Sequence, residues 1–353
     1  MITPIMVEIA EASQVGEARR IGQRMAASCG FDEIDDGRVS LIITEAATNI
    51  LRYGNGGSII LQACYRQDET LGMEILALDR GPGMSDPGAC LRDGYSTGGT
   101  QGSGLGAMQR LSDCFDIYSA LNKGTAILCR VFPRKSSPEG LGSPKLPFSW
   151  GSIAMPYPGE DVCGDSWAAC VNNERGIFLV VDGLGHGLGA ADASREAVST
   201  FKQMSHLEPL TVMQHCNDSL RKTRGAAAAI TEIDLSKNMA RYTGIGNIAG
   251  SITSVDKSQH MVSQPGILGH STRKFQEFTY SRDKETILIM HSDGLSTRCD
   301  LRGYPGLIAR DPTLIAGVLF RDFQRDKDDA TIIVVRTTAP YTGLKEWKES
   351  SSL

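Results

Sequence analysis

Aspartates in the second half of the sequence stand beside short apolar runs, where strands are expected to begin or end. Each carboxylate would be carried toward one edge of a sheet core, and several unpaired carboxylates gathered there would raise one another's pKa. Mg²⁺ or Mn²⁺ relieves this repulsion, and two such ions can activate a water molecule and clamp a phosphoryl group. Any single member also fits an Asp-Gly turn, but the whole set in this order favours a metal site. The set comprises Asp165, Asp182, Asp293, Asp328 and Asp329.

A carboxylate and an amide lie four residues apart in a largely apolar segment of the first half, at Glu45 and Asn49. Residues with this spacing share one face of a helix. The amide oxygen can hold a hard cation, and the carboxylate can orient or deprotonate a hydroxyl group. Taken alone, the pair also fits the solvent-facing edge of an amphipathic helix, so its meaning depends on the motifs that follow it.

An aspartate and two glycines end the apolar run 71–78, in the order Asp79, Gly81 and Gly83. Glycine lets the backbone approach a ligand closely, and an acidic side chain at the end of a buried strand suits a ligand contact. A Pro-Gly turn would explain the glycines, but it leaves the position of Asp79 unexplained.

A second glycine cluster occupies 93–106 and runs into a predicted helix. Free amide groups and the positive end of a helix dipole would cradle phosphates there. A Rossmann dinucleotide loop needs a strand directly before its glycines, and the preceding residues here are polar, so we reject that alternative. The candidate residues of this cluster are Gly98, Gly99, Gly102, Gly104 and Gly106.

The elements that would position these residues are predicted from hydrophobic periodicity. In the first half we expect helices at 35–53 and 104–111 and strands at 58–65, 71–78 and 125–132. The second half is mostly strands, expected at 176–181, 226–233, 239–245, 286–290 and 331–335, with helices at 190–204 and 210–221.

The length of 353 residues exceeds what one hydrophobic core usually supports, so two domains are expected. A segment rich in Pro, Ser and Gly, 133–151, is typical of a linker. We therefore predict a first domain at 1–134, a linker at 135–150, a second domain at 151–338 and a polar tail at 339–353.

The composition argues against several classes of protein. The net charge is −5 and no basic tract occurs, so neither nucleic acid nor an anionic membrane is an expected partner. No apolar run approaches the ~20 residues that span a bilayer, and the N-terminus lacks the pattern of a signal peptide. Nine cysteines without a CxxC pair indicate reduced thiols, which favours a cytoplasmic location.

Taken in order, the motifs of the first half resemble the GHKL ATPase superfamily: Glu45 with Asn49, Asp79-x-Gly-x-Gly, the glycines at 102–106, and Gly124-Thr125. Within it, DRGPGM, GYSTGG and GSGLGAMQRL look like the small serine kinases of bacterial partner-switching (stressosome) pathways. The resemblance implies an α/β sandwich of the GHKL (Bergerat) type that binds ATP or ADP with Mg²⁺. It implies that Asn49 binds Mg²⁺, that Asp79 contacts adenine and that Glu45 is the base toward a serine hydroxyl. The glycines and Thr125 would line the nucleotide. A sensor histidine kinase shares this fold, but no histidine precedes His186 to accept a phosphoryl group.

The second half resembles the SpoIIE-like branch of the protein phosphatase 2C-like (PPM) superfamily, through DGLGHG, GIGN, PGILG, HSDGL and DDAT. The resemblance implies an α-β-β-α sandwich with two Mn²⁺ or Mg²⁺ ions. It assigns as metal ligands Asp165, Asp182, Asp293, Asp328 and the carbonyl of Gly183. Asp328 is preferred over Asp329 from where the motif aligns, and a shift by one residue would exchange them. His186 is either an acid or a residue that holds the loop, and His291 is expected to be structural.

Together the two resemblances imply a bifunctional regulator that phosphorylates and dephosphorylates a serine or threonine of a STAS-domain protein. Two alternatives stay open. The first half could only sense nucleotide and tune the phosphatase, or it could sequester a sigma factor or another regulator, as GHKL anti-sigma factors do. A homodimer is a further possibility that the sequence leaves open.

Overall fold

The computed structural model describes residues 3–66, 68–91, 104–134, 146–270, 274–283, 286–325 and 327–337, and they form two compact units. The first unit holds the described residues up to position 134 and the segment Tyr304–Arg321. The second holds those of Leu146–Gly303 and those that follow Arg321. One segment of the predicted second domain, 151–338, therefore belongs to the first unit. Across these ranges, no helix is both long and apolar enough to cross a membrane.

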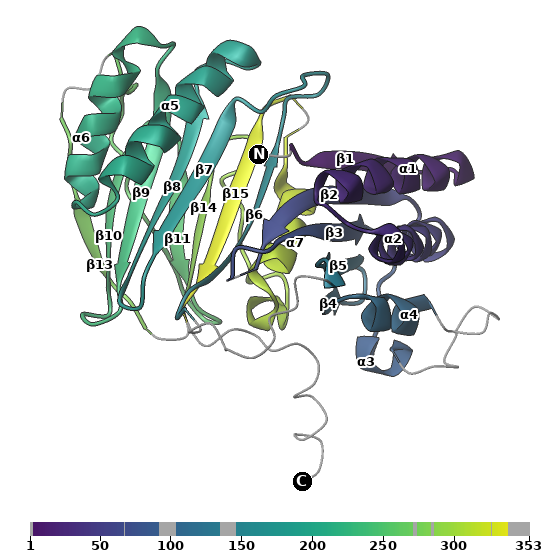
Figure 1. Ribbon diagram of the computed structural model, residues 1–353. Helices are drawn as coiled ribbons and strands as arrows, with labels where there is room; N and C mark the ends of the chain where they lie inside the picture. Colours follow the sequence, from purple (N-terminus) through teal and green to yellow (C-terminus); the bar gives the residue numbers. More distant parts are fainter. Residues whose placement is uncertain are drawn as a thin grey trace. The chain divides into compact units, whose positions relative to one another are not determined.

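The first unit is built on an antiparallel sheet of five strands in the order β1-β2-β3-β5-β4. Helices α1, α2 and α4 lie on one face of this sheet (Figure 1). The strands are β1 (Ile5–Ile9), β2 (Gly57–Tyr65), β3 (Leu71–Asp79), β4 (Cys114–Ser119) and β5 (Thr125–Val131), and the helices are α1 (Ala12–Ser28), α2 (Glu33–Tyr53), α3 (Pro87–Cys90) and α4 (Gly104–Leu111).

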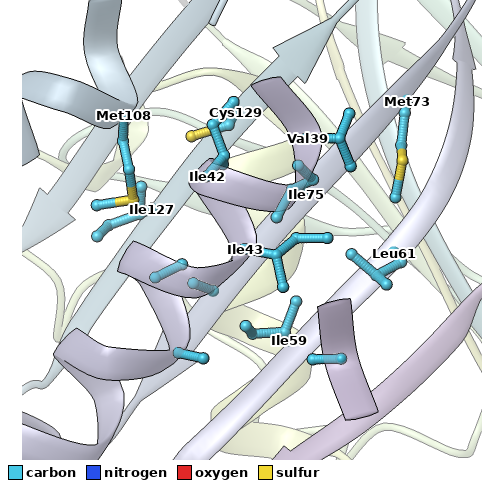
Figure 2. Close-up of a cluster of buried hydrophobic side chains, with 14 of the residues drawn as sticks. Val39, Ile42, Ile43, Ile59, Leu61, Met73, Ile75, Met108, Ile127 and Cys129 are labelled. Carbon is cyan, nitrogen blue, oxygen red and sulfur yellow. The ribbon is translucent and has the colours of Figure 1, made fainter. Parts of the chain in front are cut away.

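Helix α2 begins where the Asp32 carboxylate accepts hydrogen bonds from the amides of Ile34 (3.1 Å) and Asp35 (3.0 Å). These amides have no partner within the helix, and the negative charge complements the positive end of the helix dipole. Residues three and four apart on α2 then form the apolar stripe that packs on the sheet. Figure 2 shows this core, with Val39, Ile42 and Ile43 of α2, Ile59 and Leu61 of β2, Met73 and Ile75 of β3, Met108 of α4, and Ile127 and Cys129 of β5.

The opposite face of the same sheet packs against Tyr304–Arg321, which contains the short turn η3 (Leu307–Ala309) and most of α7 (Pro312–Phe323). Leu76 points to this face, because its neighbours Ile75 and Ala77 belong to the core under α2 and side chains alternate along a strand. A Cβ atom added to Gly317 of α7 would lie 2.5 Å from Leu76 Cδ2. The helix therefore packs directly on strand β3.

The second unit contains two antiparallel sheets of five strands each, in the orders β13-β10-β9-β8-β7 and β12-β11-β14-β15-β6. Side chains from both sheets share one core, which includes Phe178, Val180 and Tyr242 of the first sheet and Met290 and Val335 of the second. The strands are β6 (Ser149–Met155), β7 (Asp165–Val171), β8 (Arg175–Gly183), β9 (Ala226–Asp234), β10 (Met239–Ile245), β11 (Ala249–Thr253), β12 (Ser258–His260), β13 (Phe278–Ser281), β14 (Ile287–His291) and β15 (Ala330–Arg336).

Two helices, α5 (Leu188–Met204) and α6 (Pro209–Ser219), cover the outer face of the β13-β10-β9-β8-β7 sheet, and the short turn η2 (Leu220–Lys222) follows them (Figure 1). Phe201 of α5 and Val212 of α6 are fully buried there with Leu179 of β8. The second unit is thus a sandwich whose two sheets share one core and whose helical layer forms another.

All the helices and strands predicted from periodicity are present, with ends that differ by at most a few residues. Several elements were not predicted, among them β1, α1 and α7. In α7 every residue from Pro312 to Arg321 is buried, so no face of this stretch is exposed to solvent.

Replacing Ile43 by alanine should destabilise the first unit by about 3 kcal/mol, because the side chain is fully buried under α2 and its removal leaves a cavity. The matched control is Leu41→Ala on the same helix, where the side chain is 55% exposed, and the expected change is within about 0.5 kcal/mol. Urea unfolding followed by circular dichroism measures both. Equal losses for the two variants would contradict the packing described for α2.

Candidate functional sites

The end of strand β3 holds Asp79 in a fixed position. Its Oδ1 atom accepts hydrogen bonds from the amides of Gly81 (2.8 Å) and Thr125 (3.0 Å). Burial raises the pKa of Asp79, although these two amide donors oppose the shift. The predicted contact residues Asp79, Gly81 and Thr125 are therefore brought together at one point of the sheet edge.

The turns beside Asp79 require glycine for reasons of the protein's own packing. Gly124 has φ +69°, and a Cβ atom there would lie 2.0 Å from the Asp79 carbonyl oxygen. Gly83 has φ +71°, and its Cβ would lie 2.0 Å from the carbonyl oxygen of Ala120. The close approach that the sequence suggested for Gly83 is thus an approach to backbone of the same unit.

Glu45 and Asn49 lie on α2 and meet the start of helix α4. A Cβ atom on Gly104 would lie 2.7 Å from Glu45 Oε2 and 3.8 Å from both polar atoms of the Asn49 amide. Residues more than fifty positions apart in sequence therefore face one another. Gly106 is buried two residues further along α4. The predicted residues Gly98, Gly99 and Gly102 lie outside the described residues.

Helix α2 connects these two groups of residues. It ends at Gly54, where an added Cβ atom would lie 2.6 Å from Cβ of Asp79. Glu45 precedes Gly54 by nine residues, which corresponds to about 13 Å along a helix axis. Helix α2 thus carries Glu45 and Asn49 in its middle and reaches Asp79 at its C-terminal end.

In the second unit, β7 and β8 set two of the predicted aspartates opposite each other. Asp165 pairs with Asp182 across the antiparallel ladder. The hydroxyl of Ser292 donates to Asp165 Oδ2 at 2.5 Å, and the same oxygen of Ser292 accepts from the amide of Thr331 at 3.0 Å. Asp165 is therefore held by the segment that also carries Asp293.

The carboxylates of this group act strongly on one another. Burial, followed by the charge of Asp182, raises the pKa of Asp165 well above its ordinary value. Burial, followed by Asp293 and Asp328, raises the pKa of Asp182 to about 7. Burial and then Asp293 also raise the pKa of Asp328. All four predicted acidic ligands are consequently close enough to repel one another, and bound cations or protons would reduce this repulsion.

Asn247 is a site residue to which sequence reasoning gave no role. Its amide donates to Asp293 Oδ2 at 2.6 Å and to Asp182 Oδ2 at 3.4 Å. Its motif, GIGN, was noticed only as part of a family pattern, and the contact depends on the turn between β10 and β11. Within the part of the chain that the structure describes, no three Asp, Glu, His or Cys side chains converge closely enough to bind one ion as they stand.

Asp328 and Asp329 differ in their surroundings. Asp329 is buried, and its Oδ1 accepts from the Tyr157 amide at 2.8 Å. Its other oxygen, Oδ2, is buried without a hydrogen-bond partner among the described residues, 2.6 Å from where a Cβ on Gly164 would lie. Asp328 is partly exposed, and its carboxylate accepts from the amide of Asp329. Both residues therefore remain candidates for a cation ligand.

His186 stands on the loop after β8 and is held on two sides. Its Nδ1 atom lies 2.8 Å from Glu160 Oε1, and its ring stacks on Tyr157 with centroids 4.6 Å apart. Gly183, the last residue of β8, packs so tightly that an added Cβ would lie 2.1 Å from the Ala190 carbonyl oxygen. His291 is buried with Nδ1 2.8 Å from the Ser292 carbonyl oxygen, and burial lowers its pKa, as a structural residue requires.

The two units have the folds of a histidine kinase-like ATPase domain and of a PPM-type phosphatase domain. Residues 9–130 match the family described as the histidine kinase-like ATPase domain, and residues 172–338 match stage II sporulation protein E (SpoIIE). The chain thus belongs to the histidine kinase-like ATPase family in its first half and to the SpoIIE family in its second. The predicted families and fold class are confirmed.

The relatives divide in the same way. The serine/threonine-protein kinase RsbT of Bacillus subtilis (strain 168) is 36% identical over 110 residues, which are 31% of this chain and 82% of RsbT. The phosphoserine phosphatase RsbX of the same organism is 26% identical over 147 residues, 41% of this chain and 73% of RsbX. A solved structure described as "The bacterial stressosome: a modular system that has been adapted to control secondary messenger signaling" is 26% identical, with a TM-score of 0.50. It covers 54% of this chain and 99% of that one. The chain therefore combines a kinase-like and a phosphatase domain of the partner-switching type.

The stability of the second unit without added metal should fall as the pH rises from about 4 to 7. In this window the folded state holds a proton on Asp182 that the unfolded state has lost, because the pKa of Asp182 is about 7 in the folded chain. The expected loss is roughly 2 to 4 kcal/mol, measured by urea unfolding in chelator.

Asp182→Asn should reduce this slope, whereas Asp192→Asn, at an exposed carboxylate of α5, should leave it in place. A wild-type stability that stays level from pH 4 to 7 would show that the folded carboxylates do not repel one another as described.

Proposed function

We propose that this chain is a bifunctional partner-switching enzyme that phosphorylates and dephosphorylates a serine or threonine of a STAS-domain protein. The observation that carries the proposal is that one chain holds both sets of functional groups. Glu45 and Asn49 face Gly104 in the first unit, and the aspartate cluster shares one electrostatic field in the second. The similarity to a kinase, RsbT, and to a phosphoserine phosphatase, RsbX, supports opposed activities.

In the first unit, α2 would present the reacting groups to ATP. Asp79, whose carboxylate is already oriented by two amides, would receive the adenine amino group. Asn49 would hold Mg²⁺ through its amide oxygen, and Glu45 would take the proton from the substrate hydroxyl. ATP bound with Mg²⁺ supplies the phosphoryl group. The glycines at 98–106 would bind the phosphates through backbone amides. Thr125, whose amide donates to Asp79 Oδ1, would line the nucleotide beside Asp79.

In the second unit, Asp165, Asp182, Asp293, Asp328 and the Gly183 carbonyl are the proposed ligands of two Mn²⁺ or Mg²⁺ ions. The donor set fits, since hard oxygen ligands that repel one another favour a cation, and so does the buried Asp329 Oδ2, which has no hydrogen-bond partner among the described residues. Bound ions would supply an activated water molecule for hydrolysis of the phosphoserine.

The neighbouring side chains have positioning roles in this proposal. Ser292 holds Asp165 through a short hydrogen bond, and Asn247 keeps Asp182 and Asp293 at a fixed separation. His186, oriented by Glu160, would donate a proton to the departing serine oxygen. If that proton transfer is not needed, the same contacts make His186 a loop anchor.

A phosphotransfer assay tests the kinase half. The full chain carrying Asp182→Asn and Asp293→Asn is mixed with Mg-ATP and STAS-domain proteins of the same organism, so that phosphoprotein accumulates. Adding Glu45→Gln should lower phosphate incorporation by about 100-fold or more, because the base is lost. Glu17→Gln, at an exposed carboxylate of α1, is the matched control.

Wild type should then remove the phosphate in the presence of Mn²⁺. A lack of phosphoprotein, despite measurable ADP binding, would contradict the kinase assignment. It would leave a phosphatase whose first half senses nucleotide or sequesters a regulator such as a sigma factor.

Metal binding tests the phosphatase half. Mn²⁺ should raise the melting temperature of wild type more at pH 8 than at pH 5, because the ligands must be deprotonated to bind. Asp293→Asn should abolish both this shift and the Mn²⁺-dependent hydrolysis of p-nitrophenyl phosphate, and Asp192→Asn should preserve both. Comparing Asp328→Asn with Asp329→Asn identifies the ligand, since the ligand variant loses activity at low Mn²⁺ and recovers less of it at high Mn²⁺.

A further inference from the structure

A buried arginine from the second half of the sequence holds the end of strand β3. Arg321, near the end of α7, is 5% exposed and belongs to the first unit. Its Nη1 donates to the Asp79 carbonyl oxygen at 2.6 Å, and its Nη2 donates to the Lys123 carbonyl oxygen at 2.8 Å. One guanidinium thus joins the proposed adenine residue to the turn between β4 and β5.

This contact needs the shape of an arginine. The planar guanidinium presents several donors in a fixed fork, so it can bond two carbonyl oxygens at once, whereas a lysine ammonium is a single compact charge. Gly124 leaves room for it, because a Cβ atom there would lie 2.9 Å from Arg321 Nη1. Asp79 is therefore held through its side chain by the amides of Gly81 and Thr125, and through its carbonyl by Arg321.

The segment that carries Arg321 is itself anchored to the sheet of the first unit. Arg130 of β5 makes two hydrogen bonds of 2.8 Å to the Asp311 carboxylate and a third of 2.8 Å to the Thr313 hydroxyl. Asp116 of β4 accepts from the Asp311 amide at 2.8 Å. Bidentate and buried bonds of this kind fix geometry, so the start of α7 is anchored to β4 and β5.

The chain after Arg321 leads directly to the proposed metal ligands. Within the second unit, the Ser296 amide donates to the Phe323 carbonyl, and the Arg325 amide donates to the Gly294 carbonyl, both at 2.8 Å. Gly294 follows Asp293, and Asp328 lies seven residues after Arg321. The described residues that directly follow Arg321 are therefore hydrogen-bonded to the backbone beside Asp293.

We propose that Arg321 is a positioning residue for the nucleotide site, and that through it nucleotide and metal bind this chain with linked affinities. A nucleotide on Asp79 would select one position of Arg321, and the metal loop that follows it would be biased by the same amount. Linkage is reciprocal, so occupation of the metal site changes nucleotide affinity by an equal factor. This inference rests on the proposed nucleotide and metal sites.

The test is a double-mutant cycle on the full chain, with a fluorescent ADP analogue titrated at one fixed Mg²⁺ concentration. The four proteins are wild type, R321K, the D182N/D293N variant and the combination. R321K should weaken ADP binding by about tenfold, which corresponds to the loss of one good hydrogen bond to the site. The control R195K lies at an exposed arginine of α5 and should bind as wild type does.

Loss of the metal ligands should change ADP affinity by about threefold or more in the wild-type background and leave it unaltered in R321K. Equal ADP affinities for wild type and R321K would overturn the positioning role, and additive effects in the cycle would overturn the linkage. Wild type that binds no ADP would instead contradict the proposed nucleotide site. The comparison of wild type with D182N/D293N needs no change at Arg321, so the linkage stays testable if R321K proves unstable.

Discussion

Like charges held at one edge of two sheets are the constraint on which the second unit depends. Antiparallel pairing places the start of β7 beside the end of β8, so Asp165 and Asp182 stand opposite each other whether or not a cation is present. Burial, followed by the charges of neighbouring carboxylates, raises both pKa values, and this cost is tolerated because backbone hydrogen bonds in the sheets hold the strands in register. A fold that carries this cost suits a site that binds cations.

The first unit holds two groups of residues at a defined distance: Glu45 with Asn49, and Asp79. Helix α2 does this because its buried stripe on the sheet prevents it from turning or sliding, while Glu45 and Asn49 project toward Gly104. Its far end meets Asp79 at Gly54. A nucleotide that reaches from Asp79 to Glu45 would therefore lie along helix α2, with its phosphates at the end where α4 begins.

Most of helix α7 belongs to the first unit, although it lies in the second half of the sequence. The SpoIIE match includes α7, yet most of this helix packs on the sheet of the first unit. Its residues from Pro312 to Arg321 are all buried, and its last arginine bonds to the backbone beside the proposed adenine contact. The linker at 133–151 therefore does not mark where one functional unit ends, and a chain cut there would lose part of the first unit's packing.

The sequence by itself determined part of the local elements, the two families and most of the acidic and glycine motifs, because periodicity, strand-end aspartates and glycine spacing are properties of neighbouring residues. Only the tertiary structure decided which of these residues meet. The hydrogen bonds from Asn247 to Asp182 and from Arg321 to Asp79 join positions 65 and 242 residues apart, and no local pattern encodes them. The place of helix α7 is a similar case: every residue from Pro312 to Arg321 is buried, and its packing on the first unit depends on partners that lie far away in the sequence.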